Sequence, residues 1–293
     1  MKRLLLWLVI LALVVAGAGL WLTRARAVEP ERFAALEGDA ARGEAVFWAG
    51  GCASCHTAAE SDDPLALPGG KRFATPFGTF IAPNISPDAT HGIGGWSLPT
   101  FASALLEGTS PDGAHYYPAF PWTTYARMTD ADVADLWAFM ATLPPQDRAD
   151  VPHEVGFPFN IRASLGGWKF LFADDDWVMP ADTPELERGR YLVEALGHCA
   201  ECHTPRNALG GPDKTLWMAG APNPAGEGKI PGLRQGQLDW SAEDIAYFLE
   251  SGFTPDFDSA GGQMAEVVEN MSKLAPEDRA AIAAYVKALP PVQ

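Results

Sequence analysis

Residues 52–56 read CASCH and residues 199–203 read CAECH, and together they contain all four cysteines of the 293-residue chain. Each stretch offers two thiols separated by two residues and a histidine directly after the second thiol. This order is typical of haem c attachment, in which both thiols bond to the porphyrin and the histidine binds the iron. The pattern predicts two covalently bound haem c groups, held by Cys52, Cys55, His56, Cys199, Cys202 and His203.

Other uses of the same cysteines explain less of the pattern. A structural zinc site could take four thiolates, but it would close across half of the chain and leave both histidines without a role. Disulfides within each pair would form tight, strained rings. A thioredoxin-like dithiol needs one pair and no histidine after it. Zinc is the alternative that stays open beside haem.

A second duplication surrounds the two motifs. Residues 96–112 read WSLPTFASALLEGTSPD, and residues 240–256 read WSAEDIAYFLESGFTPD. Apolar side chains recur on one face of each, so both are predicted helices. A further helix is predicted in 129–145 and in 276–291, and each of these segments ends in Pro-Pro. The expected N-terminal caps are Ser97, Thr129 and Ser241, and the expected C-terminal stops are Gly108 and Gly252.

The repeat divides the chain into two mainly helical halves. We predict a first domain at 36–147, an ordered linker at 148–183 and a second domain at 184–293. The linker holds five Phe or Trp residues between positions 157 and 172, so it should pack on one or both domains.

The N-terminal segment is apolar and lies outside both halves. Nineteen uncharged residues run from Leu4 to Leu22, with basic residues on either side. A run of this length can cross the hydrocarbon layer as one helix, whereas the apolar part of a cleaved signal peptide is usually shorter. Residues 1–27 are therefore predicted to be a membrane anchor. Cleavage after Ala27, which the sequence Ala25-Arg26-Ala27 would permit, is the alternative.

The charge of the chain is strongly acidic. The formal net charge is −16, and residues 1–30 contribute +3, so the remainder carries −19. This argues against nucleic-acid binding, which needs a basic surface. An acidic surface can steer the protein toward a basic docking face, and it also favours solubility.

Several longer strings give the chain a family resemblance. They are TPFGTFIAPNISPD (75–88), GIGGWS (92–97), HYYPAFPWTTYARMTDADV (115–133), CHTPRNALGG (202–211) and ESGFTPDFDSAGGQMAEVV (250–268). With them the chain resembles the membrane-anchored, multi-haem cytochrome c subunits of periplasmic alcohol, gluconate and related dehydrogenases. It departs from them in carrying two haem motifs instead of three.

The resemblance implies two class I cytochrome c domains in tandem behind a transmembrane helix. It implies electron transfer at the bacterial inner membrane, with the haem domains in the periplasm, where haem c is attached. The implied partners are a periplasmic dehydrogenase and other cytochromes or a terminal oxidase. The chain would then be an electron carrier, not an enzyme. The alternative is a dihaem enzyme, of the peroxidase or thiosulfate-oxidising type, with an open or weakly ligated iron.

The sixth iron ligand of the second haem should be a methionine, the usual soft partner of histidine in this kind of cytochrome. Met264 stands in GGQMAEVV, the string that carries the distal methionine in the resembling family. Met218 and Met271 are expected to fill the core.

The first half lacks the corresponding methionine, because Phe120 stands where many of the resembling proteins have Met. We predict Met128 as the sixth ligand of the first haem, with Met140 in the core. A hydrophobic contact with the next helix is the other role open to Met128. His115 and an open site are the other ligand alternatives.

Two further predictions concern residues near the motifs. Pro68 and Pro205 are expected to present carbonyls to the proximal histidines, as groups around metal-bound histidines often do. His198, which directly precedes Cys199, is predicted to lie at the surface.

Overall fold

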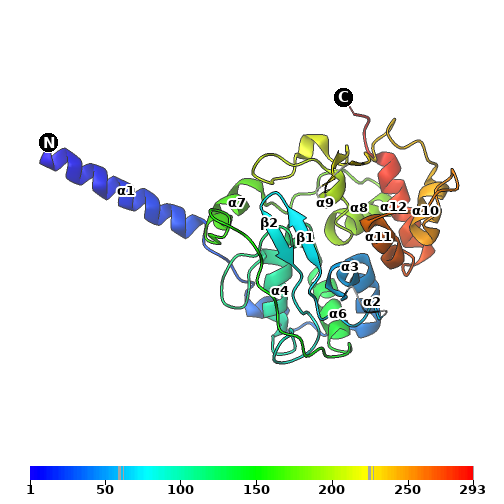
Figure 1. Cartoon of the computed structure of the whole chain (residues 1–293), viewed down its shortest axis with the longest axis horizontal. Coiled ribbons are helices and arrows are strands. Elements are labelled where there is room, and N and C mark those ends of the chain that lie inside the picture. The colour runs from blue at the N-terminus through cyan, green and yellow to red at the C-terminus, as the bar shows by residue number, and fades with distance from the viewer. Residues whose placement is uncertain (59–60, 62, 224–225, 227, 293) are drawn as a thin grey trace.

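A computed structural model describes residues 1–58, 61, 63–223, 226 and 228–292. The chain is mainly helical, as predicted, and the long helix α1 (Lys2–Leu22) projects from the body of the molecule (Figure 1). Its most apolar window has a mean hydropathy of 2.6, and no part of that window is buried. In the part of the chain described, α1 alone has the length and composition to cross a membrane.

The two halves repeat one order of elements. The first half contains α2 (Ala40–Ala49), α3 (Cys52–His56), the hairpin β1 (Arg72–Thr75) and β2 (Gly78–Ile81), α4 (Leu98–Glu107), α5 (Trp122–Tyr125) and α6 (Asp130–Met140). The second half contains α8 (Pro184–Tyr191), a π-helical turn (Leu192–Leu196), α9 (Ala200–His203), the hairpin β3 (Ala221–Pro222) and β4 (Lys229–Ile230), α10 (Ala242–Ser251), α11 (Gln263–Met271) and α12 (Pro276–Ala288). Short 3-10 turns lie at Pro30–Phe33 and Lys214–Leu216.

The predicted helix ends are confirmed. The side chains of Ser97, Thr129 and Ser241 each accept a hydrogen bond from the backbone N–H three residues on. Gly108 and Gly252 end α4 and α10 in the left-handed region, with φ of 55° and 77°. A side chain is disfavoured there, which explains why both repeats stop at glycine.

In each half the first and last helices cross at a glycine. A Cβ atom on Gly43 of α2 would lie 1.9 Å from the carbonyl oxygen of Asp135 in α6. A Cβ atom on Gly189 of α8 would lie 2.1 Å from the carbonyl oxygen of Ala281 in α12. Any side chain would push the two backbones apart, so these crossings depend on glycine.

Each crossing also carries an arginine–aspartate pair. Arg42 Nε lies 2.6 Å from Asp135 Oδ2, and Arg188 Nε lies 2.7 Å from Asp278 Oδ1. Both arginines donate a second hydrogen bond to the other carboxylate oxygen, which gives the forked geometry favoured by guanidinium groups.

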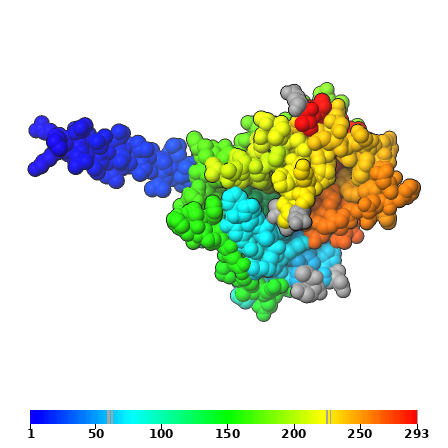
Figure 2. Space-filling model, turned by 45° about the horizontal axis from the view of Figure 1, so that its top comes forward, coloured from blue at the N-terminus to red at the C-terminus, as the bar shows by residue number. Residues whose placement is uncertain are grey.

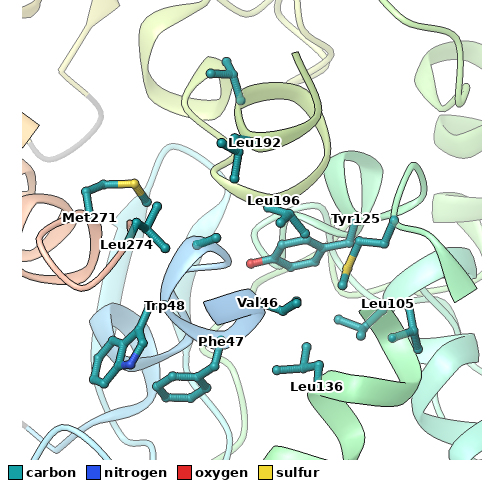
Figure 3. Close-up of a cluster of buried hydrophobic side chains, with 14 of the residues drawn as sticks. Val46, Phe47, Trp48, Leu105, Tyr125, Leu136, Leu192, Leu196, Met271 and Leu274 are labelled. Atoms are coloured by element: carbon teal, nitrogen blue, oxygen red, sulfur yellow. The ribbon is translucent and has the colours of Figure 1, made fainter. Parts of the chain in front are cut away.

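The two halves share one hydrophobic core. Its buried members include residues of α2 to α6 in the first half and of the π-helical turn and α9 to α12 in the second. Figure 3 shows Leu196 of the π-helical turn near Tyr125 of α5 and Val46 of α2. Met271 and Leu274 lie on the same side of this cluster as Trp48. The halves are therefore packed together through side chains from both.

The linker between the halves is ordered and contains α7 (Ser164–Phe172). Glu154 N–H donates to the Thr79 carbonyl in the first half at 2.9 Å. Trp168 Nε1 donates to the Leu209 carbonyl in the second half at 3.0 Å. The linker thus contacts both halves, as the aromatic content predicted. The predicted end of the second domain, residue 293, lies outside the described residues.

Candidate haem sites

Each Cys-x-x-Cys-His motif folds into a single helical turn. Cys52 and Cys55 are three residues apart on α3, so they lie on the same face of the turn. Cys199 and Cys202 are related in the same way at α9. The four thiols are free of disulfides and half-buried. Both pairs therefore offer two sulfurs on one side of a rigid turn.

The histidine of each motif is oriented by a proline carbonyl. His56 Nδ1 lies 2.8 Å from the Pro83 oxygen, and His203 Nδ1 lies 2.8 Å from the Pro231 oxygen. With Nδ1–H donating to the carbonyl, Nε2 keeps its lone pair for a metal ion.

The expectation that Pro68 would hold His56 and Pro205 would hold His203 is wrong. The carbonyls that hold the rings come 27 and 28 residues after their histidines, beyond the hairpins β1–β2 and β3–β4. In the first half, the residue after Pro68 donates its N–H to the main-chain carbonyl of His56 at 2.8 Å, not to its ring. Only the return of the chain after the hairpin places a carbonyl at Nδ1.

Burial sets the protonation of these groups. It lowers the pKa of His56 and His203, and the proline carbonyls partly oppose this effect. It raises the pKa of Cys52 and Cys199 to about 12 and that of Cys55 to about 11. The imidazoles are therefore neutral, as metal ligation requires, and the cysteines are thiols.

These properties fit haem c and do not fit zinc. A structural zinc site needs four cysteine or histidine ligands that converge on one point. Among the residues described, no three His, Cys, Asp or Glu side chains form a group that could hold a metal ion. Haem c instead needs one histidine nitrogen and a flat apolar cleft. Half-buried apolar side chains pack against the core in both halves, including the repeated tryptophans Trp96 and Trp240.

The segments that lead into the two motifs touch each other. Nε2 of His198, the residue before Cys199, lies 3.2 Å from the place where Gly51 would carry a Cβ atom. Its ring meets that of Tyr125 edge-on, with centroids 6.0 Å apart. Tyr125 in turn donates its hydroxyl hydrogen to the Gly50 carbonyl at 2.7 Å. The expectation that His198 lies at the surface is wrong, because the packing of the two halves encloses its ring.

α11 of the second half also contacts the first motif. Asn270 of α11 donates its side-chain N–H to the Ser54 hydroxyl oxygen at 2.5 Å. Lys71 donates to the Ser54 carbonyl at 2.9 Å and also pairs with Glu266 of α11. α11 begins at Gln263, so the helix that carries Met264 also fixes α3 of the other half.

The methionines of the second half occupy two kinds of position. Met264 is half-buried near the start of α11. Met218 and Met271 are 0% and 5% exposed and belong to the core, as expected of fillers. Met218 repeats Leu67 of the first half: the Met218 carbonyl accepts a hydrogen bond from the chain after β4, and the Leu67 carbonyl accepts one from the chain after β2.

In the first half, Met128 is 5% exposed and lies in the shared core. Leu274, at the matching place before α12, is also 5% exposed, so a hydrocarbon can fill this position. The role of Met128 as an iron ligand stays a prediction. His115 is held elsewhere, with Nε2 3.0 Å from the Thr23 carbonyl just beyond α1. Phe120 is half-buried and packs against the rings of Tyr116 and Tyr125.

Comparison with known proteins agrees with this geometry. The family model for cytochrome c matches residues 40–144 and again residues 186–290, one match for each half. The chain belongs to the cytochrome c family. Tandem cytochrome c domains are therefore confirmed as its fold, and two covalently bound haem c groups as its cofactors.

Individual relatives extend the comparison. The chain is 60% identical over 286 residues to a protein of Cereibacter sphaeroides named diheme cytochrome c-type, and 97% of each chain is covered. It is 37% identical to the fructose dehydrogenase cytochrome subunit of Gluconobacter japonicus, with 95% of this chain and 57% of the relative covered. It is 38% identical to the gluconate 2-dehydrogenase cytochrome c subunit of Pantoea cypripedii, with 88% and 62% covered. The cytochrome thus spans about 60% of the length of these two dehydrogenase subunits.

Proposed function

We propose that this cytochrome is a membrane-anchored electron carrier that passes electrons from a periplasmic dehydrogenase toward a respiratory acceptor. The contact between the segments that lead into the two attachment motifs is the observation that carries the proposal. Tyr125 and His198 both meet the Gly50–Gly51 segment that leads into Cys52, so the two haem-bearing turns belong to one packed body. A relay needs its two redox centres at a fixed, short separation.

Each motif residue has a proposed role in this relay. The cysteines would fix the haem edge, and His56 and His203 would each bind iron through Nε2 while Nδ1 donates to a proline carbonyl. Met264 is the proposed sixth ligand in the second domain, and Met128 in the first. Haem c supplies a one-electron change at iron, and a histidine–methionine pair favours the ferrous state.

The dehydrogenase as electron donor is inferred from the relatives. Two of them are named as cytochrome subunits of dehydrogenases, and both are longer than this chain. The acidic charge of the exported part would favour a basic docking face on the donor or acceptor. Co-purification from detergent-solubilised membranes, with identification of the bound proteins, tests this step. Isolation of the cytochrome with no dehydrogenase under mild detergent would count against it.

An enzymatic role of the peroxidase or thiosulfate-oxidising type would need an iron with an open or weakly bound sixth position. The carrier role instead expects both irons to hold two protein ligands. The spectrum of the ferrous native protein should therefore not change when carbon monoxide is added. A carbon monoxide adduct at one native haem would support the enzyme.

Haem attachment at the two motifs is tested by removing one pair of thiols at a time. A pyridine haemochrome assay on the denatured wild-type chain should give two haems c per polypeptide. Cys199→Ala/Cys202→Ala should keep one, because the first motif retains both of its thiols. The matched variant Cys52→Ala/Cys55→Ala should also keep one. Two haems in either variant would show that these cysteines are not the attachment points.

Anchoring by α1 has its own test. Residues 4–22 of α1 are apolar and almost all exposed, so burial in lipid removes a large hydrocarbon surface from water. The native cytochrome should stay with membranes through washes in concentrated salt and should be released by detergent, with residues 2–22 retained. Recovery from the periplasm with Val28 at the N-terminus would instead show a cleaved signal peptide.

A further inference from the structure

The linker meets the membrane anchor where the anchor ends. A Cβ atom on Gly166 of α7 would lie 1.9 Å from the carbonyl oxygen of Thr23, the residue directly after α1. In Figures 1 and 2, α1 leaves the body beside the green segment that contains α7. If α1 spans the bilayer, α7 therefore lies at the level where the chain emerges from the hydrocarbon layer.

The linker exposes large apolar side chains at this level. The exposed fractions are 81% for Phe157, 45% for Phe159, 48% for Ile161, 72% for Phe170 and 63% for Leu171. On α7, Phe170 lies one turn after Gly166 on the side that meets Thr23, and Leu171 lies further round the helix. Exposed aromatic and aliphatic side chains in such number mark an interaction surface, and Phe and Leu suit the membrane interface.

A polar cavity lies next to the apolar surface. It has a volume of about 290 Å³ and lies between the end of α1, the end of α4 and α7. Its lining includes the cations Arg24, Arg26 and Lys169, against one carboxylate, Glu107. Burial raises the pKa of Glu107 and lowers that of Lys169 to about 8, and the Lys169 ammonium already donates to the Glu107 and Gly108 carbonyls. The cavity can therefore take an anion chiefly through Arg24 and Arg26.

Two residues that line the cavity each carry a buried polar atom with no partner among the described residues. These atoms are Trp122 Nε1 and His115 Nδ1, on side chains that are 4% and 6% exposed. The indole N–H can only donate, as a phosphate oxygen requires. His115 Nε2 faces the Thr23 carbonyl and donates to it, so Nδ1 is free to accept, as a hydroxyl requires. Unsatisfied buried groups of this kind often mark a site for a ligand or water.

We propose that residues 157–171 and this cavity form a phospholipid-binding surface in the outer headgroup layer of the membrane. The cavity would take the phosphate of an anionic, hydroxyl-bearing headgroup of the phosphatidylglycerol type, and the apolar side chains would face the acyl region. This proposal rests on the proposed anchoring by α1.

The charges near α1 support this occupant. Arg24 and Arg26 lie on the exported side of the span, where basic residues are usually depleted, and phosphate binding gives them a role there. After α7, Asp174 pairs with Lys214 at 2.5 Å, and Asp175 adds a negative charge near Glu107. Arg24 and Arg26 are exposed, so both can face the lipid.

The test uses the full-length cytochrome with both haems in phosphatidylglycerol nanodiscs. One lipid probe carries a photoreactive diazirine at the headgroup, and the other carries it at the end of an acyl chain. Mass spectrometry then maps the labelled peptides. The headgroup probe should label residues 157–172, and the acyl-end probe should label residues 4–22.

Two sets of variants locate the surface. Phe170→Ser/Leu171→Ser should lose most of the headgroup labelling in 157–172, because both side chains are exposed and do not support the fold. Arg24→Gln/Arg26→Gln should lower it as well. Tyr247→Ser, which removes a 57% exposed ring in the second domain, should leave it unchanged.

The outcomes separate this proposal from the anchor. Labelling of 4–22 without labelling of 157–172 would overturn the lipid surface and leave the anchor intact. Labelling of neither segment would overturn both. Equal labelling in wild-type and Phe170→Ser/Leu171→Ser protein would show that the apolar side chains do not hold the lipid.

Discussion

The Met264→Leu variant is expected to lose the near-infrared sulfur-to-iron band of the second haem and to keep both covalent haems. Leucine fills a similar volume but cannot bind iron, so the ferrous state loses the ligand that favours it. The reduction potential of that haem should fall by on the order of 0.2 V, within the roughly 0.8 V span over which axial ligands act. Met218→Leu is the matched control, because Met218 is fully buried in the core.

The same substitution in the first domain decides the role of Met128. Met128→Leu should remove the sulfur band of the first haem and leave that of the second. Folding should be little affected, since Leu274 fills the matching position. A surviving band in Met128→Leu, with a changed first haem in His115→Ala, would refute the assignment. If neither substitution changes the first haem and the native protein binds carbon monoxide, the enzymatic alternative gains support.

Gly43→Ala adds a single methyl group and should nevertheless cause a large loss of stability. The methyl group would lie 1.9 Å from the Asp135 carbonyl oxygen, so α2 and α6 would have to separate. The free energy of unfolding should fall by about 3 kcal/mol, the upper range for overpacking a tight interior. Guanidinium unfolding followed by far-ultraviolet circular dichroism measures it.

Variants of two further glycines serve as the comparison and the control for that experiment. Gly189→Ala should cost a similar amount, because its methyl group would meet the Ala281 carbonyl at 2.1 Å. Gly167→Ala is the control: no neighbour lies within 4 Å and the residue is helical, so alanine should stabilise the protein by up to about 1 kcal/mol. Equal stabilities for the three variants would mean that the helix crossings tolerate a wider separation.

The sequence was informative where structure depends on neighbouring residues. Ser97 and Ser241 cap their helices with the residues that follow them, and Gly108 and Gly252 supply a backbone conformation of their own, so both signals are local. The motif residues also lie within one turn. Internal duplication then carried each prediction from one half to the other, and the family model matches both halves.

Features that depend on long-range packing were missed. No local pattern connects His56 with Pro83, because the carbonyl reaches the ring only after the hairpin brings the chain back. His198 was misplaced for a related reason. Its burial results from the docking of one half on the other, and an isolated second domain would leave it exposed. The duplicated prolines Pro83 and Pro231, each two residues before a repeated apolar position, were the one available signal for the histidine partners.

The contacts between α11 and α3 bear on how the gene could have evolved. Duplication of a single-haem ancestor would have given two interchangeable copies, each able to fold alone. Here Asn270 and Glu266 of the second copy support Ser54 and Lys71 of the first, and in the reverse direction Thr123 of α5 donates its hydroxyl hydrogen to Glu201 of the second motif at 3.4 Å. Each copy now supports the motif of the other through different side chains, so separating them at the linker should yield halves that recombine, and duplicating the second half in place of the first should fail to do so.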